Sequence, residues 1–102
     1  MILHIASFRW KDEVTPADVT AVTDALRSMA AGIPELRSYV CGENLRLRPG
    51  ADFGVAAIVE DEAGLGAYLD SDAHKKVYEE FLGWMIAERS AAQLPVGDGA
   101  SL

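Results

Sequence analysis

A tyrosine and a histidine six positions apart are the residues of this chain best suited to carry chemistry. Tyr68 lies on one expected helix and His74 opens the next, with the Ser71-Asp72 break between them. Imidazole exchanges protons near neutral pH, and a phenol can hold or polarise a substrate oxygen. The break would let both side chains converge on one cavity. The alternative is that Tyr68 is a core residue with its hydroxyl at the edge, and that His74 is an idle residue of a first helical turn.

His4 is the other histidine, and it lies on an alternating segment beside Ala6 and Phe8. A buried imidazole needs a hydrogen-bond partner, so His4 is either a satisfied core residue or a polar group at the floor of a pocket. Two histidines and one cysteine, Cys41, argue against a Cys/His zinc site within one chain. We therefore expect no bound metal, and we interpret Cys41 as a strand residue in a reducing compartment.

Size and charge limit the classes of function that the chain can serve. Its 102 residues suffice for one domain with one core, and half of them are apolar, as in an ordinary soluble protein. A formal net charge of −7 argues against nucleic acid as a partner and against an anionic membrane surface. No apolar run is long enough to span a bilayer, and the first residues lack the basic region of a signal peptide. We expect a cytoplasmic protein.

Alternation and turn signals predict the first half of the fold. Residues 2–10 alternate with apolar side chains on both faces, which predicts a strand. Thr15-Pro16 predicts a helix start, and Gly32 and Pro34 predict the end of that helix. Two further strands are expected at residues 37–47 and 53–59, joined by a turn.

Two more helices are expected in the second half. Asp61-Glu62 opens a short helix, and Asp72 can cap a longer one that runs from Ala73 to about Arg89. Residues 90–96 are either irregular or a last strand. A flexible tail is expected over residues 97–102, which leaves a single domain over residues 1–96.

The resulting element order is β-α-β-β-α-α-β, and it predicts an α+β fold. A ferredoxin-like, four-stranded antiparallel sheet with helices on one face fits this order. The first and third strands are apolar on both faces, although the helices can cover only one. An uncovered apolar face needs a partner, and two identical sheets that pair about a two-fold axis are the simplest solution. We therefore expect a homodimer.

Several short features, taken in order along residues 2–90, resemble the stress-responsive A/B barrel (Dabb) family. They are His4 with Phe8, Lys11-Asp12, Ile33-Pro34, Gly42-Glu43-Asn44 and the segment from Tyr68 to His74. The resemblance implies a ferredoxin-like protomer that forms a dimeric alpha/beta barrel. Many members have no assigned activity, but a characterised plant member closes a linear polyketide by aldol condensation without metal or organic cofactor. Its catalytic tyrosine and histidine match Tyr68 and His74, and a histidine that matches His4 is also present.

The resemblance also implies a changed pocket. Two aromatic residues that line the plant enzyme's pocket match Thr23 and Leu26 here. An aspartate often found on the last strand of the family is not matched, since Ala92 and Gln93 occupy that region. The residues expected to bind substrate beside the Tyr68/His74 pair are His4, Phe8, Thr23, Leu26 and Phe81.

Three functions are compatible with these expectations. The first is a cofactor-independent, polyketide-cyclase-like enzyme (a cyclase or lyase) for a small oxygenated organic molecule, with His74 as base, Tyr68 at the carbonyl oxygen and His4 as support. The second is a non-catalytic, stress-responsive homodimer that binds a ligand, in which no cavity would reach His74. The third is a heme- or oxygen-handling dimeric barrel, as in related superfamilies, which would need an imidazole free to bind iron.

Overall fold

Strand β1 (Ile2–Trp10) lies inside the sheet and pairs with a strand on each side. The computed structural model describes residues 1–102 and has the sheet order β2-β3-β1-β4. The edge strands are β2 (Ser38–Glu43) and β4 (Ile86–Pro95), and β3 (Phe53–Val59) pairs with both β1 and β2. Every pairing is antiparallel, as the sequence predicted.

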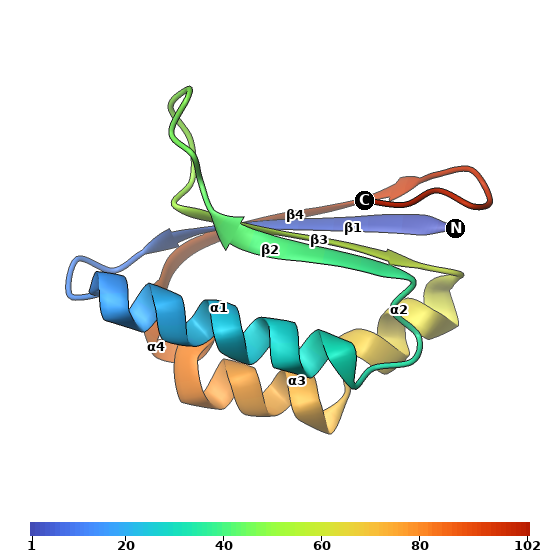
Figure 1. Ribbon diagram of the computed structural model, residues 1–102, viewed down its shortest axis with the longest axis horizontal. Coiled ribbons are helices and arrows are strands. Elements are labelled where there is room, and N and C mark those ends of the chain that lie inside the picture. The colour runs from blue at the N-terminus through green and yellow to red at the C-terminus, as the bar shows by residue number, and fades with distance from the viewer.

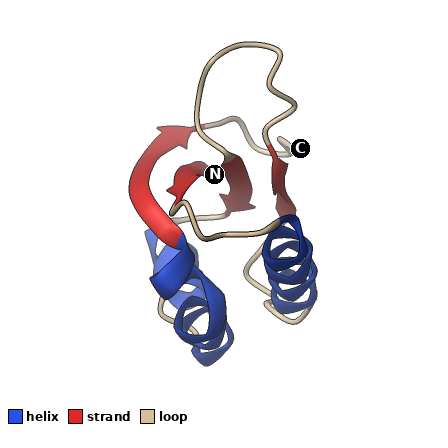
Figure 2. Cartoon of the chain, turned by 90° about the vertical axis from the view of Figure 1, so that its left-hand side faces the viewer, coloured by secondary structure: helices blue, strands red, loops and turns tan.

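All helices lie on one face of this sheet (Figures 1 and 2). The long helix α1 (Pro16–Ala31) is followed, after β2 and β3, by the short helix α2 (Glu62–Leu69). The last helical segment consists of α3 (Asp72–Val77), the π-helical turn η1 (Tyr78–Leu82) and the single turn α4 (Gly83–Met85). This arrangement confirms the predicted α+β, ferredoxin-like fold. None of the helices is long and apolar enough to cross a membrane.

Local sequence signals delimit α1. The Thr15 hydroxyl accepts a hydrogen bond from the Asp18 N–H, and the Asp18 carboxylate accepts one from the Thr15 N–H, which together form a capping box. Pro16 opens the helix at a position where no N–H donor is needed. The buried residues of α1 recur at helical spacing, and they are Val19, Val22, Leu26 and Met29.

The side chain of Ser71 closes the break between α2 and α3. Its hydroxyl donates to the Tyr68 carbonyl at 2.8 Å and accepts from the His74 N–H at 3.1 Å. Ser71 is therefore the N-cap of α3, whereas the sequence predicted Asp72, because the Ser71 hydroxyl is the group that reaches a free N–H of the first turn. One side chain thus braces the backbone of both Tyr68 and His74.

The last helix is shorter than predicted. Helical spacing predicted that it would continue to about Arg89, but α4 ends at Met85 and β4 begins at Ile86. The sequence of residues 86–92, IAERSAA, suits a helix. Here these residues pair with β1, which would otherwise be an edge strand with unpaired N–H and C=O groups. The last strand, which the sequence left open, is therefore present and starts earlier than the expected residue 90.

The connection between β2 and β3 is longer than predicted. We expected β2 to reach Leu47, but the strand ends before Asn44. The Asn44 side chain accepts from the Arg46 N–H and donates across the loop to a backbone carbonyl, so it folds the chain away from the strand pairing. Loop 44–52 projects on the side of the sheet opposite the helices (Figure 1), where Leu45 and Leu47 are exposed.

The inner face of the sheet, towards the helices, has small residues at its centre. Side chains two apart on a strand share a face, so cross-strand partners form rows. Three successive rows are Tyr39, Ala57, His4 and Gln93; then Cys41, Val55, Ala6 and Ala91; then Glu43, Phe53, Phe8 and Arg89. The middle row leaves space between two rows of larger side chains.

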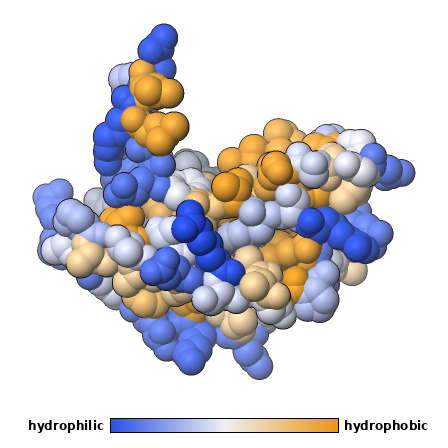
Figure 3. Space-filling view, in the orientation of Figure 1, coloured by the Kyte–Doolittle hydropathy of each residue, from blue (hydrophilic) through white to orange (hydrophobic).

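The outer face of the sheet is covered by no helix (Figure 2). It presents Val40, Ile5 and Leu94 at exposures of 53%, 38% and 46%. Between β2 and β4 it also carries a row of small residues, namely Gly42, Gly54, Ser7 and Ser90. Apolar atoms gather along this side of the molecule and on the projecting loop (Figure 3). It is the uncovered apolar face that the sequence predicted.

The last residues turn back towards the sheet. The Val96 N–H donates to the Met1 carbonyl at 3.0 Å, and the Leu102 N–H donates to the Ser38 hydroxyl at 2.9 Å. The expected domain boundary at residue 96 and the expected flexibility of residues 97–102 stay predictions.

Candidate active site

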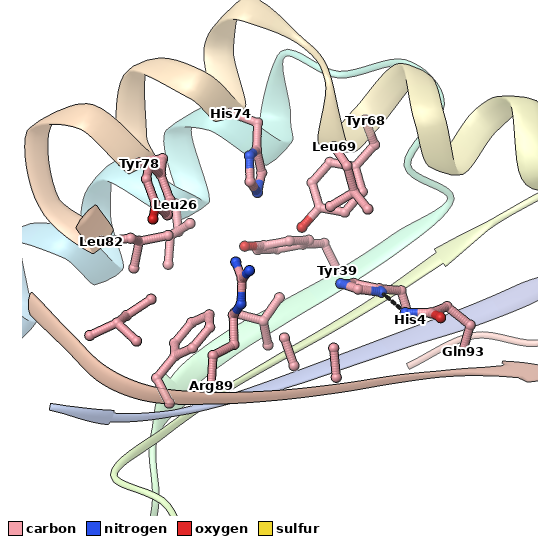
Figure 4. Close-up of a pocket in the computed structure, with 15 residues that line it drawn as sticks. His4, Leu26, Tyr39, Tyr68, Leu69, His74, Tyr78, Leu82, Arg89 and Gln93 are labelled. Carbon is pink, nitrogen blue, oxygen red and sulfur yellow. Dashed lines mark hydrogen bonds between the residues drawn. The ribbon is translucent and has the colours of Figure 1, made fainter.

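A cavity of about 280 Å³ lies between the helices and the inner face of the sheet (Figure 4). Ala6 and Ala91 of the middle row form part of its floor, and residues of α2, α3 and η1 close it from above. Small-molecule sites have volumes of roughly 300–1,000 Å³, so this cavity lies at the small end of that range. It is of the size expected for a small organic molecule.

Tyr68 and His74 meet at this cavity. Their rings lie edge to face, with centroids 5.4 Å apart and an angle of 89° between the planes. The His74 side chain points into the cavity, and the residue hydrogen bonds to Ser71 only through its backbone N–H (Figure 4). Burial, followed by the charges of His4 and Arg89, lowers the pKa of His74 below its ordinary value of 6.5. The imidazole is therefore neutral at pH 7 and free to accept a proton.

Tyr68 is held in place by other rings. Its side chain is buried, and its ring centroid lies 6.2 Å from that of His4 and 6.3 Å from that of Tyr39. Burial raises the pKa of Tyr68 to about 12, so the hydroxyl keeps its proton at neutral pH. The hydroxyl reaches the cavity (Figure 4), where it can donate a hydrogen bond to a ligand oxygen.

His4 lies at the floor of the cavity and is buried. Its Nδ1 is 2.9 Å from Nε2 of Gln93, the residue directly opposite on β4. Burial and the charge of Arg89 lower the pKa of His4 below 6.5. The two interpretations left open by the sequence apply together, since His4 has a hydrogen-bond partner and also lines the cavity.

The structure brings together five of the seven residues expected at the site. These are His4, Phe8, Leu26, Tyr68 and His74. Thr23 does not line the cavity, and its hydroxyl donates to the Val19 carbonyl of its own helix at 2.7 Å. Phe81 does not line it either. The wider turn η1 rotates the helix face, so that Tyr78 and Leu82 face the cavity instead. The roles of the five residues stay predictions.

Four polar residues of the cavity were not proposed from the sequence. They are Tyr39, Tyr78, Arg89 and Gln93. Alternation along β2 could have found Tyr39, which shares the inner face with Cys41. Arg89 was assigned to the end of a helix, and only the pairing of β4 with β1 brings it to the inner face. The Tyr39 hydroxyl is buried without a hydrogen-bond partner, and burial raises the pKa of Tyr39.

The polar groups of the cavity suit acid–base chemistry on a carbonyl compound. A neutral imidazole can take a proton, and protonated phenols can stabilise the oxyanion that results. No carboxylate lines the cavity. No group of three or more His, Cys, Asp or Glu side chains in the chain lies close enough together to hold a metal ion.

Comparisons with known proteins agree with this fold. Residues 2–93 match the stress responsive A/B barrel domain, Dabb. An uncharacterised protein of Streptomyces coelicolor is 34% identical over 94 residues, which are 86% of this chain and 97% of the relative. A dimeric ferredoxin-like protein of unknown function from Thermobifida fusca is 42% identical, with a TM-score of 0.86 over 93% of this chain and 90% of its own.

An enzyme shares the fold at low sequence identity. Hydroxynitrile lyase from Passiflora edulis has a TM-score of 0.79 with this chain at 12% identity, over 97% of this chain and 95% of the lyase. At that identity the likeness shows the fold alone.

Proposed function

Because the chain belongs to the stress-responsive A/B barrel (Dabb) family, we propose that it is a cofactor-independent, polyketide-cyclase-like enzyme for a small oxygenated organic molecule. The observation that carries the proposal is the edge-to-face contact of Tyr68 and His74 at a cavity that both side chains line. The same fold serves an enzyme in the hydroxynitrile lyase. That likeness supports a catalytic role for the fold and says nothing of the substrate.

The chemistry assigned to the pair is an aldol-type ring closure. His74 takes the proton from a carbon beside a carbonyl group, and the electron pair of that C–H bond forms an enolate. The Tyr68 hydroxyl donates a hydrogen bond to the enolate oxygen. The enolate carbon attacks a second carbonyl carbon of the same molecule, and the alkoxide formed there takes the proton from the His74 imidazolium. The ring closure changes no oxidation state overall and returns the abstracted proton to the product.

A homodimer is part of the proposal. Several solved structures of this fold, including the Thermobifida fusca protein, are described as dimeric. The uncovered sheet face of this chain presents Ile5, Val40 and Leu94 together with a row of small residues that permit close approach. A second copy that packs its own sheet on this face would remove these side chains from water.

A non-catalytic, ligand-binding homodimer is the alternative. That hypothesis requires Tyr68 and His74 to be packed together with no cavity at His74. The cavity that both residues line supports the enzyme over this alternative.

Deuterium uptake tests the catalytic proposal. Small aryl methyl ketones in D₂O report removal of a proton beside a carbonyl, and NMR follows the exchange. His74→Ala should reduce uptake to the rate without protein, and Tyr68→Phe should reduce it about 100-fold by removing the hydrogen bond to the enolate. Lys75→Ala, at an exposed neighbour on α3, is the matched control and should leave the rate unchanged. Full activity of His74→Ala with an intact fold would end the proposal. Absence of uptake by the unmodified protein would favour the alternative.

A further inference from the structure

The cavity wall carries one permanent positive charge and no negative one. The chain has 16 acidic and nine basic residues, yet none of the carboxylates lines the cavity. Arg89 does line it. Three other arginines, namely Arg9, Arg37 and Arg46, form ion pairs within the chain, and Arg89 forms none. This acidic protein therefore has an arginine at the wall of its cavity that is exposed and has no carboxylate partner in the chain.

The strand register explains why Arg89 points inward. Arg89 lies opposite Phe8 on β1, in the inner row of side chains. Its neighbour Glu88 pairs with Arg9 on the opposite face at 3.7 Å, as alternation along a strand requires. Figure 4 shows the Arg89 side chain rising from β4 into the cavity, towards Tyr39 and His74. Its direction is thus set by the β4 pairing rather than by an internal ion pair.

Tyr39 supplies a second group at the same place. Its hydroxyl is buried and has no hydrogen-bond partner in the chain. Buried hydroxyl groups are nearly always hydrogen bonded, so this hydroxyl, which lies near the Tyr68 and Cys41 side chains, is still free to donate to a group that enters beside it. The Tyr39 side chain extends from β2 into the cavity, on the side towards Arg89 (Figure 4). A planar guanidinium and a phenol then face the same volume.

We propose that Arg89 and Tyr39 bind a carboxylate of the substrate, so that the protein acts on a small organic acid that also carries two ketone groups. This inference rests on the proposed function and specifies its substrate class. Arginine presents parallel N–H donors that match the two oxygens of a carboxylate, and the Tyr39 hydroxyl can donate to one of the same oxygens. The rest of the molecule lies over Ala6 and Ala91, with its reacting carbon beside the His74 imidazole and the neighbouring carbonyl oxygen at the Tyr68 hydroxyl.

Binding of a carboxylate would also change the pKa of His74, the proposed base. The charge of Arg89 lowers the pKa of both His4 and His74. A bound carboxylate offsets that charge and so restores part of the basicity of His74 when substrate is present. The binding group and the base are coupled through the cavity, although they come from β4 and α3.

Binding of benzoate and benzamide tests the inference without turnover. The two molecules have the same shape, but only benzoate is an anion. NMR titration of backbone amides should show that the protein binds benzoate about tenfold or more tightly than benzamide, because charge-assisted hydrogen bonds are the stronger ones. Arg89→Gln should remove this preference while benzamide binds as before, which shows that the cavity is intact. Tyr39→Phe should reduce the preference in part.

The matched control is Arg9→Gln, which removes one positive charge from the opposite face of the sheet and should leave the preference unchanged. Equal binding of benzoate and benzamide, no saturable benzoate binding at millimolar concentration, or an unchanged preference in Arg89→Gln would each overturn the inference. Failure of the proposed function is distinguishable from these results. In that case His74→Ala would keep deuterium uptake, whatever the preference for benzoate.

Discussion

His4 and Gln93 face each other across neighbouring strands, and their side chains are joined between Nδ1 and Nε2 at 2.9 Å. An amide nitrogen carries only donors, so in this orientation Nδ1 of His4 must accept and its proton must lie on Nε2. Burial keeps His4 a neutral imidazole at pH 7 by lowering its pKa, and its other nitrogen faces the cavity (Figure 4). The floor of the site is thus set by a contact between residues 89 positions apart in the chain.

The two histidines should make the stability of the protein depend on pH in a definite direction. Burial lowers the pKa of His4 and of His74 in the folded state below the ordinary 6.5. Below about pH 6.5 the two histidines are protonated in the unfolded chain but remain neutral in the folded chain until the pH is lower. The free energy of unfolding should therefore fall as the pH is lowered from about 7.5 to about 5.5. Urea unfolding at several pH values measures it.

Gln93→Glu is the variant that distinguishes the contribution of His4 from that of His74 in this experiment. A carboxylate opposite Nδ1 favours the imidazolium and raises the pKa of His4, so the loss of stability over the same pH window should be smaller. The titration of Asp52 does not contribute to the change in stability over this pH window. Hydrogen bonds from Trp10 and Arg46 lower the pKa of Asp52 below 3.8, so its contribution to stability is lost only at more acidic pH. An equally steep loss in Gln93→Glu would contradict the neutral state assigned to His4.

Gly83→Ala should destabilise the protein although it removes a glycine from a helical segment. Replacing glycine by alanine inside a helix usually stabilises it by about 1 kcal/mol. A Cβ at position 83 would lie 3.0 Å from the Tyr78 carbonyl oxygen and 3.3 Å from Cε1 of its ring. Relieving this contact would disturb η1 and move Tyr78 in the cavity wall, at a cost of about 1–3 kcal/mol. Thermal unfolding measures the net change.

The control for this substitution is Gly97→Ala, where a Cβ would meet no atom within 4 Å. Its melting temperature should stay close to that of the unmodified protein. A higher melting temperature for Gly83→Ala would show that the close approach of Gly83 and Tyr78 imposes no strain on an added side chain.

Ile5→Glu should separate the proposed dimer. Ile5 lies on the uncovered face between Ala56 of β3 and Ala92 of β4, so a carboxylate there would be buried against a second sheet without a partner. Analytical ultracentrifugation should show a monomer of about half the mass of the unmodified protein. Trp84→Glu is a matched control, since Trp84 is an apolar side chain of similar exposure on the helical side. If Ile5→Glu sediments like the unmodified protein, this face does not form the dimer.

The sequence predicted most of the fold because local signals and tertiary packing agree there. The strand expected from the alternation of residues 2–10 and the helix start expected at Thr15-Pro16 are both found in the structure. The predicted end of the last helix was wrong, because there the local sequence signals and the tertiary packing disagree. Helical spacing continues towards Arg89, but the open edge of β1 takes the residues after Met85 as a strand. Nothing in the sequence of residues 86–95 indicates that β1, about 80 residues earlier, has an edge that needs a pairing partner.

The candidate site divides in the same way. Tyr68 and His74 are close in sequence, and a single turn held by Ser71 brings them together, so their spacing was informative. Tyr39 and Arg89 reach the cavity only through strand register, which depends on the pairing of the whole sheet. Phe81 was proposed because regular helical spacing was assumed, and the extra residue in η1 rotates it away.

The uncovered face of the sheet has a consequence for how the protein can change. In a two-fold pair of identical chains, one altered codon alters two side chains, and each meets the other copy of the same surface. In the proposed dimer, a substitution at Val40 or Ile5 therefore changes the packing on both sides of the interface, whereas one at an equally exposed site on the helices changes no contact between the two chains. Variation among natural relatives should be narrower on this face than its exposure in a single chain would suggest.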